Sequence, residues 1–333
     1  MKKSLLLSLL ALSLFILPGC NKSGTTAAPG GKELTIAFMP KSKGNSFFIG
    51  CRKGAEEAAR ELGVKLLWDG PTEPEAAKQN EIIETWITRG VDSIAVACEN
   101  KEGIATALRK ARDKGIKVVT YDSDTMPDAR EFFCNQATPQ AIGATLMEEA
   151  AKAMGTEGEY AIITGSLTAA NMNEWQKHIE EVNRTKYPNL KMIALRPCDD
   201  KKDNAFNEAT ALINANPNLK LILAICSPAV PGSAEAVKQA KKEGAVKVVG
   251  LGLPNENRRY LKEGVTQAVI LWKVGDLGYL AVQAATAAAR GELKPGASTF
   301  KAGRLGELKI EGSDIILGQP FVFTKDNVDQ FDF

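Results

Sequence analysis

The stretch "SIAVACENKEGIATALRKARDKGIKVVTYD", residues 93–122, decides the fold class. It opens with an apolar run, residues 93–98, and closes with a β-branched run, residues 117–122. In the intervening residues 102–115, apolar side chains recur every three or four positions, and Gly115 ends the pattern. This spacing predicts an amphipathic helix between two buried strands. The stretch therefore predicts a βαβ unit, in which the strands run parallel and the helix covers the sheet.

The same alternation continues along the chain from Glu33 onward. Further helix candidates include "EAAKQNEIIETWITRG" and "GSAEAVKQAKKEG". The strand candidates are "LTIAFM", "VKLLWD", "SIAVAC", "KVVTYD", "YAIITG", "KMIAL", "LKLILAIC", "VKVVGLG" and "TQAVILW". Nine or ten such strands in about 300 residues exceed what one core usually serves. The sequence predicts an α/β fold with two doubly wound parallel sheets.

The first residues predict export. "MKKSLLLSLLALSLFILPGC" combines two basic residues with an apolar run, residues 4–17, that is too short for a stable membrane span. "LPGC" resembles a lipobox, at which residues 1–19 are removed and Cys20 receives a lipid. The alternative is an ordinary secretory signal with a chance cysteine. The following residues, 20–32, have the composition of a flexible tether.

Charge and cysteine content restrict the partners. The formal net charge of +2 falls to zero without the two leader lysines, so nothing favours nucleic acid or an anionic membrane surface as a partner. No cysteine pair has CxxC spacing, so neither a zinc site nor a thioredoxin-type motif is indicated. Disulfides are possible outside the cytoplasm, but their pairing stays open. The cysteines concerned are Cys51, Cys98, Cys134, Cys198 and Cys226.

Polar and aromatic residues gather where the predicted strands end. In open α/β sheets, ligands bind beyond the carboxyl ends of the strands. Lys41, Asn45, Phe47 and Phe48 follow the first strand, and Asp122 follows the fourth. "SLTAANMNEW", "SPAVP" and "LPNEN" follow later strands. These segments predict a ligand-binding site at this edge of the sheets.

The chain resembles the type I periplasmic binding proteins, which are ribose-binding-protein-like solute receptors of ABC importers. Within that family it resembles most the branch of autoinducer-2 receptors and rhamnose-binding proteins. The motifs that carry this resemblance are "GNSFFIGCRKGAEEAARELG", "DGPTEP", "GVDSIAVAC", "GIKVVTYDSDT", "NQATPQAIG", "NEW" and "VFTKDNVDQFDF", with "GLGLPNE" similar to the rhamnose-binding side. The resemblance covers essentially the whole mature chain.

The resemblance implies two lobes joined by a three-crossing hinge, with the ligand enclosed between them. It places the crossings near Asn135, near Trp272 and after about Gly303. The implied lobes are residues 33–134 plus 273–303 for the amino-terminal lobe, and residues 135–272 plus 304–333 for the carboxy-terminal lobe.

The resemblance also implies ligand-binding residues. Asn45, Phe47 and Phe48 match the asparagine and stacking phenylalanines of ribose-binding proteins. Lys41 and Asp122 match the lysine and first aspartate that autoinducer-2 receptors use. Charged donors and acceptors form the stronger hydrogen bonds to hydroxyls.

In the far lobe the chain departs from its relatives. Asn171 and Met172 stand where autoinducer-2 receptors have aspartate and glutamine, and Ser227 lies near their proline and alanine. The remaining candidates in this region are Asn135, Gln136, Asn173, Trp175 and Trp272. Because this pocket would have fewer acids and more aromatic surface, we expect a less hydroxylated ligand, such as a 6-deoxy sugar or a small cyclic diol.

Each of these residues also has a purely structural interpretation. Phe47 and Phe48 are suited to the core at the base of a helix, and we expect one of them in the cleft. Asp122 suits a turn, and Lys41 suits a solvated loop. For the far lobe the structural alternatives are a helix N-cap for Asn171 or Asn173, and lobe core for Trp175 and Trp272.

Enzyme interpretations have little support in the sequence. His178 is the only histidine and lies in a predicted helix. "GLGLPN" lacks the third glycine of a dinucleotide fingerprint. Asp122 and Asp124 alternate along an extended segment and would point to opposite faces. We expect no catalysis, no metal and no cofactor.

The sequence thus predicts a lipid-anchored receptor on the periplasmic or extracellular face of the membrane. We expect a monomer that captures a small neutral sugar-like ligand by hinge closure and delivers it to an ABC transporter permease. The alternative is an autoinducer-2 or sugar sensor that feeds a signalling partner, and the remote alternative is a secreted sugar-modifying enzyme.

Overall fold

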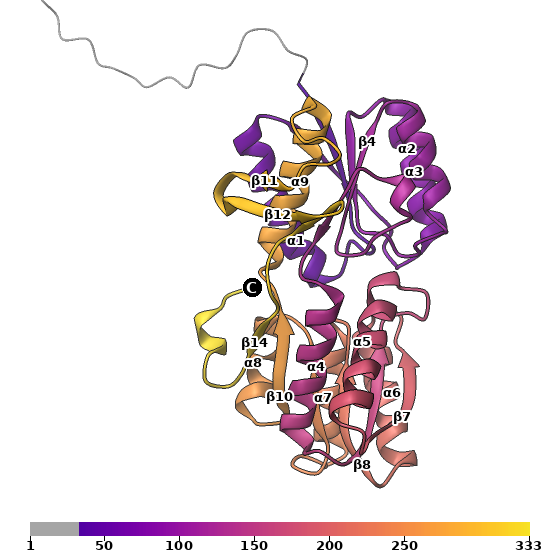
Figure 1. Cartoon of the computed structure of the whole chain (residues 1–333). Helices are drawn as coiled ribbons and strands as arrows, with labels where there is room; N and C mark the ends of the chain where they lie inside the picture. Colours follow the sequence, from indigo (N-terminus) through magenta and orange to yellow (C-terminus); the bar gives the residue numbers. More distant parts are fainter. Residues whose placement is uncertain (1–32) are drawn as a thin grey trace, which may run out of the picture. The chain divides into compact units, whose positions relative to one another are not determined.

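The computed structural model describes residues 33–333. These residues form one compact unit that contains two β-sheets with helices on both faces of each, and Figure 1 shows the two layered halves. We call the half that contains the first strand the first lobe and the other half the second lobe. The predicted leader, residues 1–19, and the predicted tether, residues 20–32 with Cys20, lie outside the described residues.

The first lobe is built on an eight-stranded sheet. Its strands are β1 (Thr35–Met39), β2 (Lys65–Trp68), β3 (Ser93–Val96), β4 (Lys117–Tyr121), β5 (Phe132–Asn135), β11 (Thr299–Lys301), β12 (Glu307–Glu311) and β13 (Asp314–Ile316). They are arranged in the order β11-β12-β13-β5-β4-β3-β1-β2. The five amino-terminal strands run parallel, as predicted, and β13 continues this direction beside β5. Strand β12 is antiparallel to both of its neighbours.

The second lobe is built on a six-stranded sheet with the order β14-β10-β9-β8-β6-β7. Its strands are β6 (Gly158–Thr164), β7 (Leu190–Pro197), β8 (Leu219–Ala224), β9 (Lys247–Leu251), β10 (Thr266–Leu271) and β14 (Phe321–Phe323). All neighbours are parallel except the edge strand β14, which is antiparallel to β10. The predicted fold class, two doubly wound parallel-sheet lobes, is confirmed.

Helices cover both faces of each sheet. In the first lobe, α1 and α9 cover one face and α2 and α3 the other; in the second, α4 and α5 lie opposite α6, α7 and α8 (Figure 1). Their bounds are α1 (Ser46–Leu62), α2 (Ala76–Arg89), α3 (Ala105–Asp113), α4 (Pro139–Met154), α5 (Ala170–Lys186), α6 (Lys202–Ala215), α7 (Ala229–Gln239), α8 (Pro254–Lys262) and α9 (Val274–Arg290), and the short 3-10 helices are Pro127–Ala129, Gly303–Leu305 and Val328–Gln330.

Burial on both faces explains why the strands are continuous apolar runs. In β1, Ile36 and Phe38 belong to one core cluster, whereas Ala37 and Met39 belong to the cluster on the opposite face of the sheet. Successive side chains of a strand point to opposite faces, so a strand covered on both sides needs apolar residues at every position.

Helices α1 and α9 pack with their backbones in direct contact. A Cβ atom at Gly54 would overlap the carbonyl oxygen of Gly275, and one at Gly278 would overlap the carbonyl oxygen of Cys51. Only glycine permits such an approach of two helices. This contact attaches α9, which enters the first lobe late in the sequence, to the helix that follows β1.

The chain passes between the lobes three times. It leaves the first sheet after Asn135 and returns after Leu271, close to the expected positions. The third passage differs from the expectation. The resemblance places residues 304–316 in the carboxy-terminal lobe, but β12 and β13 pair within the first sheet, so the passage lies between Ile316 and Phe321. Strand β12 is mostly exposed and β13 has only three residues, so neither shows the continuous apolar run that reveals a buried strand.

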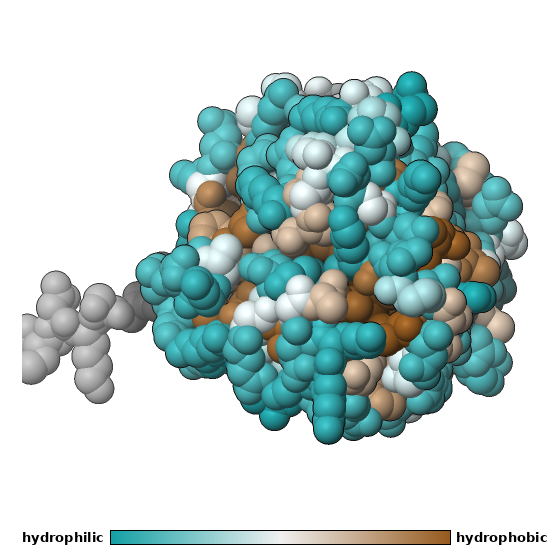
Figure 2. Space-filling model, turned by 90° about the horizontal axis from the view of Figure 1, so that it is seen from below, coloured by the Kyte–Doolittle hydropathy of each residue, from teal (hydrophilic) through white to brown (hydrophobic). Residues whose placement is uncertain are grey.

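The surface is mainly hydrophilic. Figure 2 shows hydrophilic side chains covering most of the visible face, with hydrophobic ones in strips between them. Within residues 33–333, no helix is both long enough and apolar enough to cross a membrane.

Candidate functional site

A cavity lies between loops that follow strands of both sheets. The empty space among its lining side chains, including the part that is open to solvent, is about 390 Å³. The lining combines a few charged and amide groups with a largely aromatic and aliphatic wall. The lining residues are Lys41, Asn45, Phe47, Phe48, Asp122, Asn171, Met172, Trp175, Asp200, Ile225, Cys226, Ser227, Leu251, Leu271 and Trp272.

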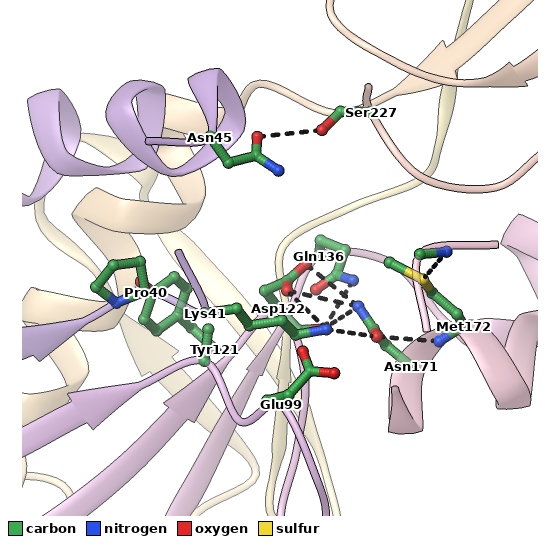
Figure 3. A network of polar contacts seen from close by, with 12 residues as sticks. Pro40, Lys41, Asn45, Glu99, Tyr121, Asp122, Gln136, Asn171, Met172 and Ser227 are labelled. Carbon is green, nitrogen blue, oxygen red and sulfur yellow. Dashed lines mark hydrogen bonds and ion pairs between the residues drawn. The ribbon is translucent and has the colours of Figure 1, made fainter. Parts of the chain in front are cut away.

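Lys41 is the cation of this site. It follows β1, and its side chain is only 1% exposed. The Nζ atom donates to Asn171 Oδ1 at 2.9 Å and lies 3.9 Å from Asp122 Oδ2 (Figure 3). A buried ammonium needs such partners, because burial removes its hydration. Its partners come from both lobes, so Lys41 spans the space between them.

Asp122 is held in an unusual backbone conformation directly after β4. Its φ is +60°, a left-handed conformation that aspartate and asparagine tolerate better than most residues. The Gln136 amide donates to the Asp122 carbonyl oxygen at 3.1 Å, and Asn171 Nδ2 lies 3.4 Å from Asp122 Oδ2. Non-glycine residues in this conformation concentrate at functional sites.

Burial and like charges shift the pKa values of this cluster. Burial raises the pKa of Asp122 to about 6, against the opposing effect of Lys41 and with a further upward contribution from Asp200 and Glu99. Burial likewise raises the pKa of the Glu99 and Asp200 carboxyls. Burial alone would lower the pKa of Lys41, but the three carboxylates outweigh it and the pKa is raised. Lys41 therefore stays charged, and Asp122 can change its protonation state near pH 6.

The opposite part of the cavity is aromatic. The ring centroids of Phe47 and Trp272 are 6.0 Å apart, and those of Trp175 and Trp272 are 6.2 Å apart, with the ring planes steeply inclined in both pairs. Phe47 in turn meets Phe48 edge-on at 5.1 Å. The buried Trp272 Nε1 has no hydrogen-bond partner among the described residues. An aromatic wall with one unused donor suits a ligand that has an apolar face and an acceptor oxygen.

Asn45 links helix α1 to the second lobe. Its Oδ1 atom accepts from the backbone N–H of Phe47 at 2.9 Å, which caps the helix, and also from Ser227 Oγ at 3.2 Å (Figure 3). Ser227 follows β8 in the second lobe. The cap fixes the start of α1 and thereby the direction in which Phe47 and Phe48 enter the cavity.

Most of the residues proposed from the sequence meet in this cavity. Nine of them line it: Lys41, Asn45, Phe47, Phe48, Asp122, Asn171, Trp175, Ser227 and Trp272. Both phenylalanines line it, although we expected only one. Both are also buried in the core at the start of α1, so the structural and the site interpretation hold together.

Asn135 and Asn173 do not line this cavity. They lie in a neighbouring pocket together with Gln136 and Asp124. Asn173 is exposed, and its amide donates to the Leu167 carbonyl oxygen at 3.1 Å. Residues two apart on a helix point in different directions, and so Asn171 enters the cavity whereas Asn173 does not.

Sequence reasoning missed several lining residues. Asp200 is the most consequential, because it brings a carboxyl group from the second lobe. It follows β7, and the rule that ligands bind beyond the carboxyl ends of strands could therefore have identified it. Met172 and Cys226 lie next to proposed residues in the sequence. Three further residues have aliphatic side chains, which do not indicate a binding role. These three are Ile225, Leu251 and Leu271.

The charged groups of the cavity lining are not accompanied by a histidine. No group of three or more His, Cys, Asp or Glu side chains in residues 33–333 is arranged to hold a metal ion. His178 lies in α5, outside the cavity lining, with its Nδ1 atom 3.2 Å from Glu181 Oε2. The arrangement can bind a small molecule through hydrogen bonds and ring stacking.

Two solved structures of ligand-binding proteins are similar to this chain. An ABC transporter solute binding protein from Clostridium phytofermentas with bound L-rhamnose is similar with a TM-score of 0.86 and 29% identity, over 90% of this chain and 98% of that chain. LsrB from Clostridium saccharobutylicum in complex with AI-2 is similar with a TM-score of 0.85 and 26% identity, over 90% of this chain and all of that one.

Sequence comparison identifies the family. The D-allose-binding periplasmic protein of Escherichia coli K12 is 29% identical over 73% of this chain and 80% of its own length. The names of this relative and of the Clostridium phytofermentas protein describe sugar binding and transport, not catalysis. The model of the periplasmic binding protein domain matches residues 36–293. The chain therefore belongs to the periplasmic binding protein family, as a substrate-binding protein of the sugar ABC importer type.

Proposed function

We propose that this protein captures a small, neutral, sparsely hydroxylated sugar in the cavity between its lobes and delivers it to an ABC permease. One observation carries the proposal: the buried charges of Lys41 and Asp122, with Asn171 beside them, line the same cavity as the aromatic wall of Phe47 and Trp272. A 6-deoxy sugar such as L-rhamnose has hydroxyl groups for the polar cluster and a methyl group and C–H groups for the aromatic wall.

The polar cluster supplies both hydrogen-bond donors and hydrogen-bond acceptors. Lys41 donates, the Asp122 carboxylate accepts, and the Asn171 amide can do either. A sugar hydroxyl loses its bonds to water on entering the cavity, and each orphaned group would cost about 1–3 kcal/mol. Charged partners compensate best, since their hydrogen bonds are the stronger ones.

The aromatic wall favours a ligand with an apolar side. Phe47, Trp175 and Trp272 offer ring surfaces to C–H groups, and Leu251 and Leu271 extend the apolar lining. A fully hydroxylated hexose would leave hydroxyls unpaired against this wall. A methyl group in place of one hydroxyl removes that penalty.

A ligand panel tests the proposal. Thermal unfolding of residues 33–333 would be followed with L-rhamnose, other 6-deoxy sugars, pentoses, hexoses, small polyols and autoinducer-2. Ligands that bind only the folded state raise the melting temperature. We expect a clear increase with a deoxy sugar. Binding of fully hydroxylated hexoses alone would overturn the proposed ligand class.

Two neighbouring asparagines provide a matched control. Asn171→Ala removes the partner of Lys41 inside the cavity, whereas Asn173→Ala changes an exposed residue of the same helix that does not line it. Titration calorimetry with the best ligand should show affinity at least about tenfold weaker for Asn171→Ala and little changed for Asn173→Ala. Equal losses in the two variants would place the site elsewhere.

Autoinducer-2 is the second candidate ligand, because LsrB from Clostridium saccharobutylicum, solved in complex with AI-2, shares the fold at a TM-score of 0.85. In this chain Lys41 and Asp122 would bind it. A temperature shift with autoinducer-2 and none with sugars would favour this candidate, and coupling to a signalling partner rather than a permease would favour a sensor.

We also propose attachment to the membrane through a lipid on Cys20, on the strength of "LPGC" after the apolar leader. Cell fractionation tests it. Wild-type protein should sediment with membranes, and Cys20→Ala should be released into the soluble extracytoplasmic fraction. The same distribution for both would exclude a lipid anchor at this residue.

A further inference from the structure

Two cysteines from different loops meet beside the cavity. Cys198 follows β7 and Cys226 follows β8, and their Sγ atoms are 3.5 Å apart. Both side chains are buried. The other three cysteines of residues 33–333 lie in the first lobe or at its boundary: Cys51 in α1, Cys98 after β3 and Cys134 at the end of β5.

We propose that Cys198 and Cys226 form a disulfide bond when the protein folds outside the cytoplasm, a condition that rests on the location implied by the proposed function. The bond would connect the two loops that lead into α6 and α7.

The geometry requires only a small movement. The sulfur atoms must approach from 3.5 Å to about 2.05 Å. Each cysteine lies just beyond a strand rather than within the hydrogen-bonded ladder, so its loop can absorb the shift. The loops stay anchored at their bases, since the Cys198 N–H donates to Thr164 and the Cys226 carbonyl accepts from Ala229.

The bond forms by thiol–disulfide exchange. Two S–H bonds break and one S–S bond forms, and the two protons and two electrons pass to a disulfide oxidant, which is reduced to two thiols. Burial, with contributions from Cys198 and Asp200, holds the pKa of the Cys226 thiol well above its usual value. Because the thiolate is the attacking form, exchange in the finished fold is slow, and the bond forms while the chain is folding.

The bond would act on the ligand cavity. Cys226 lines the cavity, and so do Asp200, two residues after Cys198, and Ser227, which donates to Asn45. A covalent link between these loops would hold Asp200 and Ser227 at fixed positions, which favours binding by preorganisation.

Mass spectrometry tests the bond directly. The full chain would be secreted, denatured without reductant, alkylated with N-ethylmaleimide and digested. We expect one linked species that joins the Cys198 and Cys226 peptides and separates on reduction, with Cys51, Cys98 and Cys134 alkylated. Alkylation of both Cys198 and Cys226 would overturn the proposal for the secreted protein.

Refolding in vitro with a mixture of reduced and oxidised glutathione tests whether the two cysteines can form the bond, independently of where the protein is located in the cell. A linked pair after refolding but not after secretion would support the site and overturn the proposed compartment. Absence of the link under both conditions, with properly folded protein, would overturn the site itself while leaving ligand binding to be judged by the panel.

Thermal unfolding with and without reductant gives a second measurement. The loop closed by the bond spans about 30 residues, so reduction should lower the melting temperature of wild type by roughly 5–10 °C. Cys198→Ser and Cys226→Ser should lose this dependence on reductant, whereas Cys134→Ser should keep it. The comparison is made within each variant, and alanine can replace serine where a serine variant folds poorly.

Discussion

At the scale of single residues, Asp122 concentrates the chemistry of the site. It lies at the end of β4 with a left-handed backbone, its carboxyl group is buried, and Lys41 and Asn171 approach it from two lobes. Asparagine adopts the same backbone conformation and has the same shape. Asp122→Asn is therefore a substitution that removes the charge and keeps the geometry.

The raised pKa of Asp122 predicts how stability depends on pH. A carboxyl group whose pKa rises to about 6 on folding stabilises the fold when protonated. That contribution is complete below pH 3.8, the ordinary pKa, and is lost as the pH rises through 6. We expect it to amount to on the order of 3 kcal/mol.

Urea unfolding of the ligand-free protein between pH 4 and 8 measures this effect. The free energy of unfolding of wild type should fall over this range by more than that of Asp122→Asn. Glu99 and Asp200 are present in both proteins, so the difference reports the charge of Asp122 together with its effect on these two neighbours. Parallel pH profiles would show that Asp122 ionises as in the unfolded chain.

Ligand affinity should also depend on the ionisation of Asp122, but it should increase with pH whereas stability decreases. A sugar hydroxyl that donates to Asp122 requires the carboxylate, which becomes scarce below pH 6. We expect binding at pH 5 to be about tenfold weaker than at pH 7, because only about a tenth of the carboxyl groups are then ionised. Calorimetric titrations at the two pH values check this, and an affinity that is unchanged would remove Asp122 from the ligand contacts.

At the scale of elements, the contact between α1 and α9 decides how the first lobe is assembled. The backbones touch at Gly54 and Gly278, where no other residue has room. Helix α9 also packs on β1, β3, β4 and β5. The contact therefore attaches the returning chain to the strands whose ends carry Lys41 and Asp122.

Gly54→Ala should destabilise the protein strongly. The added methyl group would meet the carbonyl of Gly275, which is backbone and cannot rotate away. We expect a loss of about 3 kcal/mol or more in the free energy of unfolding, measured in urea. Gly44→Ala is the control, because a Cβ there meets nothing within 4 Å. Equal effects of the two substitutions would contradict close backbone packing.

At the scale of the whole molecule, the two lobes meet through the loops that carry the site. Lys41 contacts Asn171, Asn45 contacts Ser227, and Lys201 lies 3.0 Å from Glu73 across the same boundary. The Lys201–Glu73 pair is exposed and contributes little. A β-bridge between Asn100 and Ala169 and the aromatic contacts around Trp272 also lie at this boundary. We expect the lobes to separate and close around a ligand by hinge motion of the three passages between them.

Small-angle X-ray scattering checks the closure. The radius of gyration should fall when a saturating ligand is added, because the ligand binds both lobes only in the closed form. Lys41→Met keeps the length of the side chain but loses the charge, and its radius should stay unchanged at the same ligand concentration. Equal radii of wild type with and without bound ligand would exclude hinge closure.

The sequence by itself determined the two parallel sheets and most of the site. Apolar runs such as residues 93–98 can be recognised as buried strands, because a strand covered on both faces needs apolar side chains at every position. The rule about strand ends then located Lys41 and Asp122, because it depends only on chain direction within a sheet.

Only the tertiary structure decided which residues meet. Lys41 and Asn171 are 130 residues apart, and no local pattern records that their loops face each other. The same holds for Asp200 in the cavity, for the Cys198–Cys226 contact, and for β12 and β13, which join the first sheet rather than the second. Periodicity reports whether a side chain is buried, whereas partners across two lobes depend on how the sheets are placed relative to each other, which is a property of the packed chain.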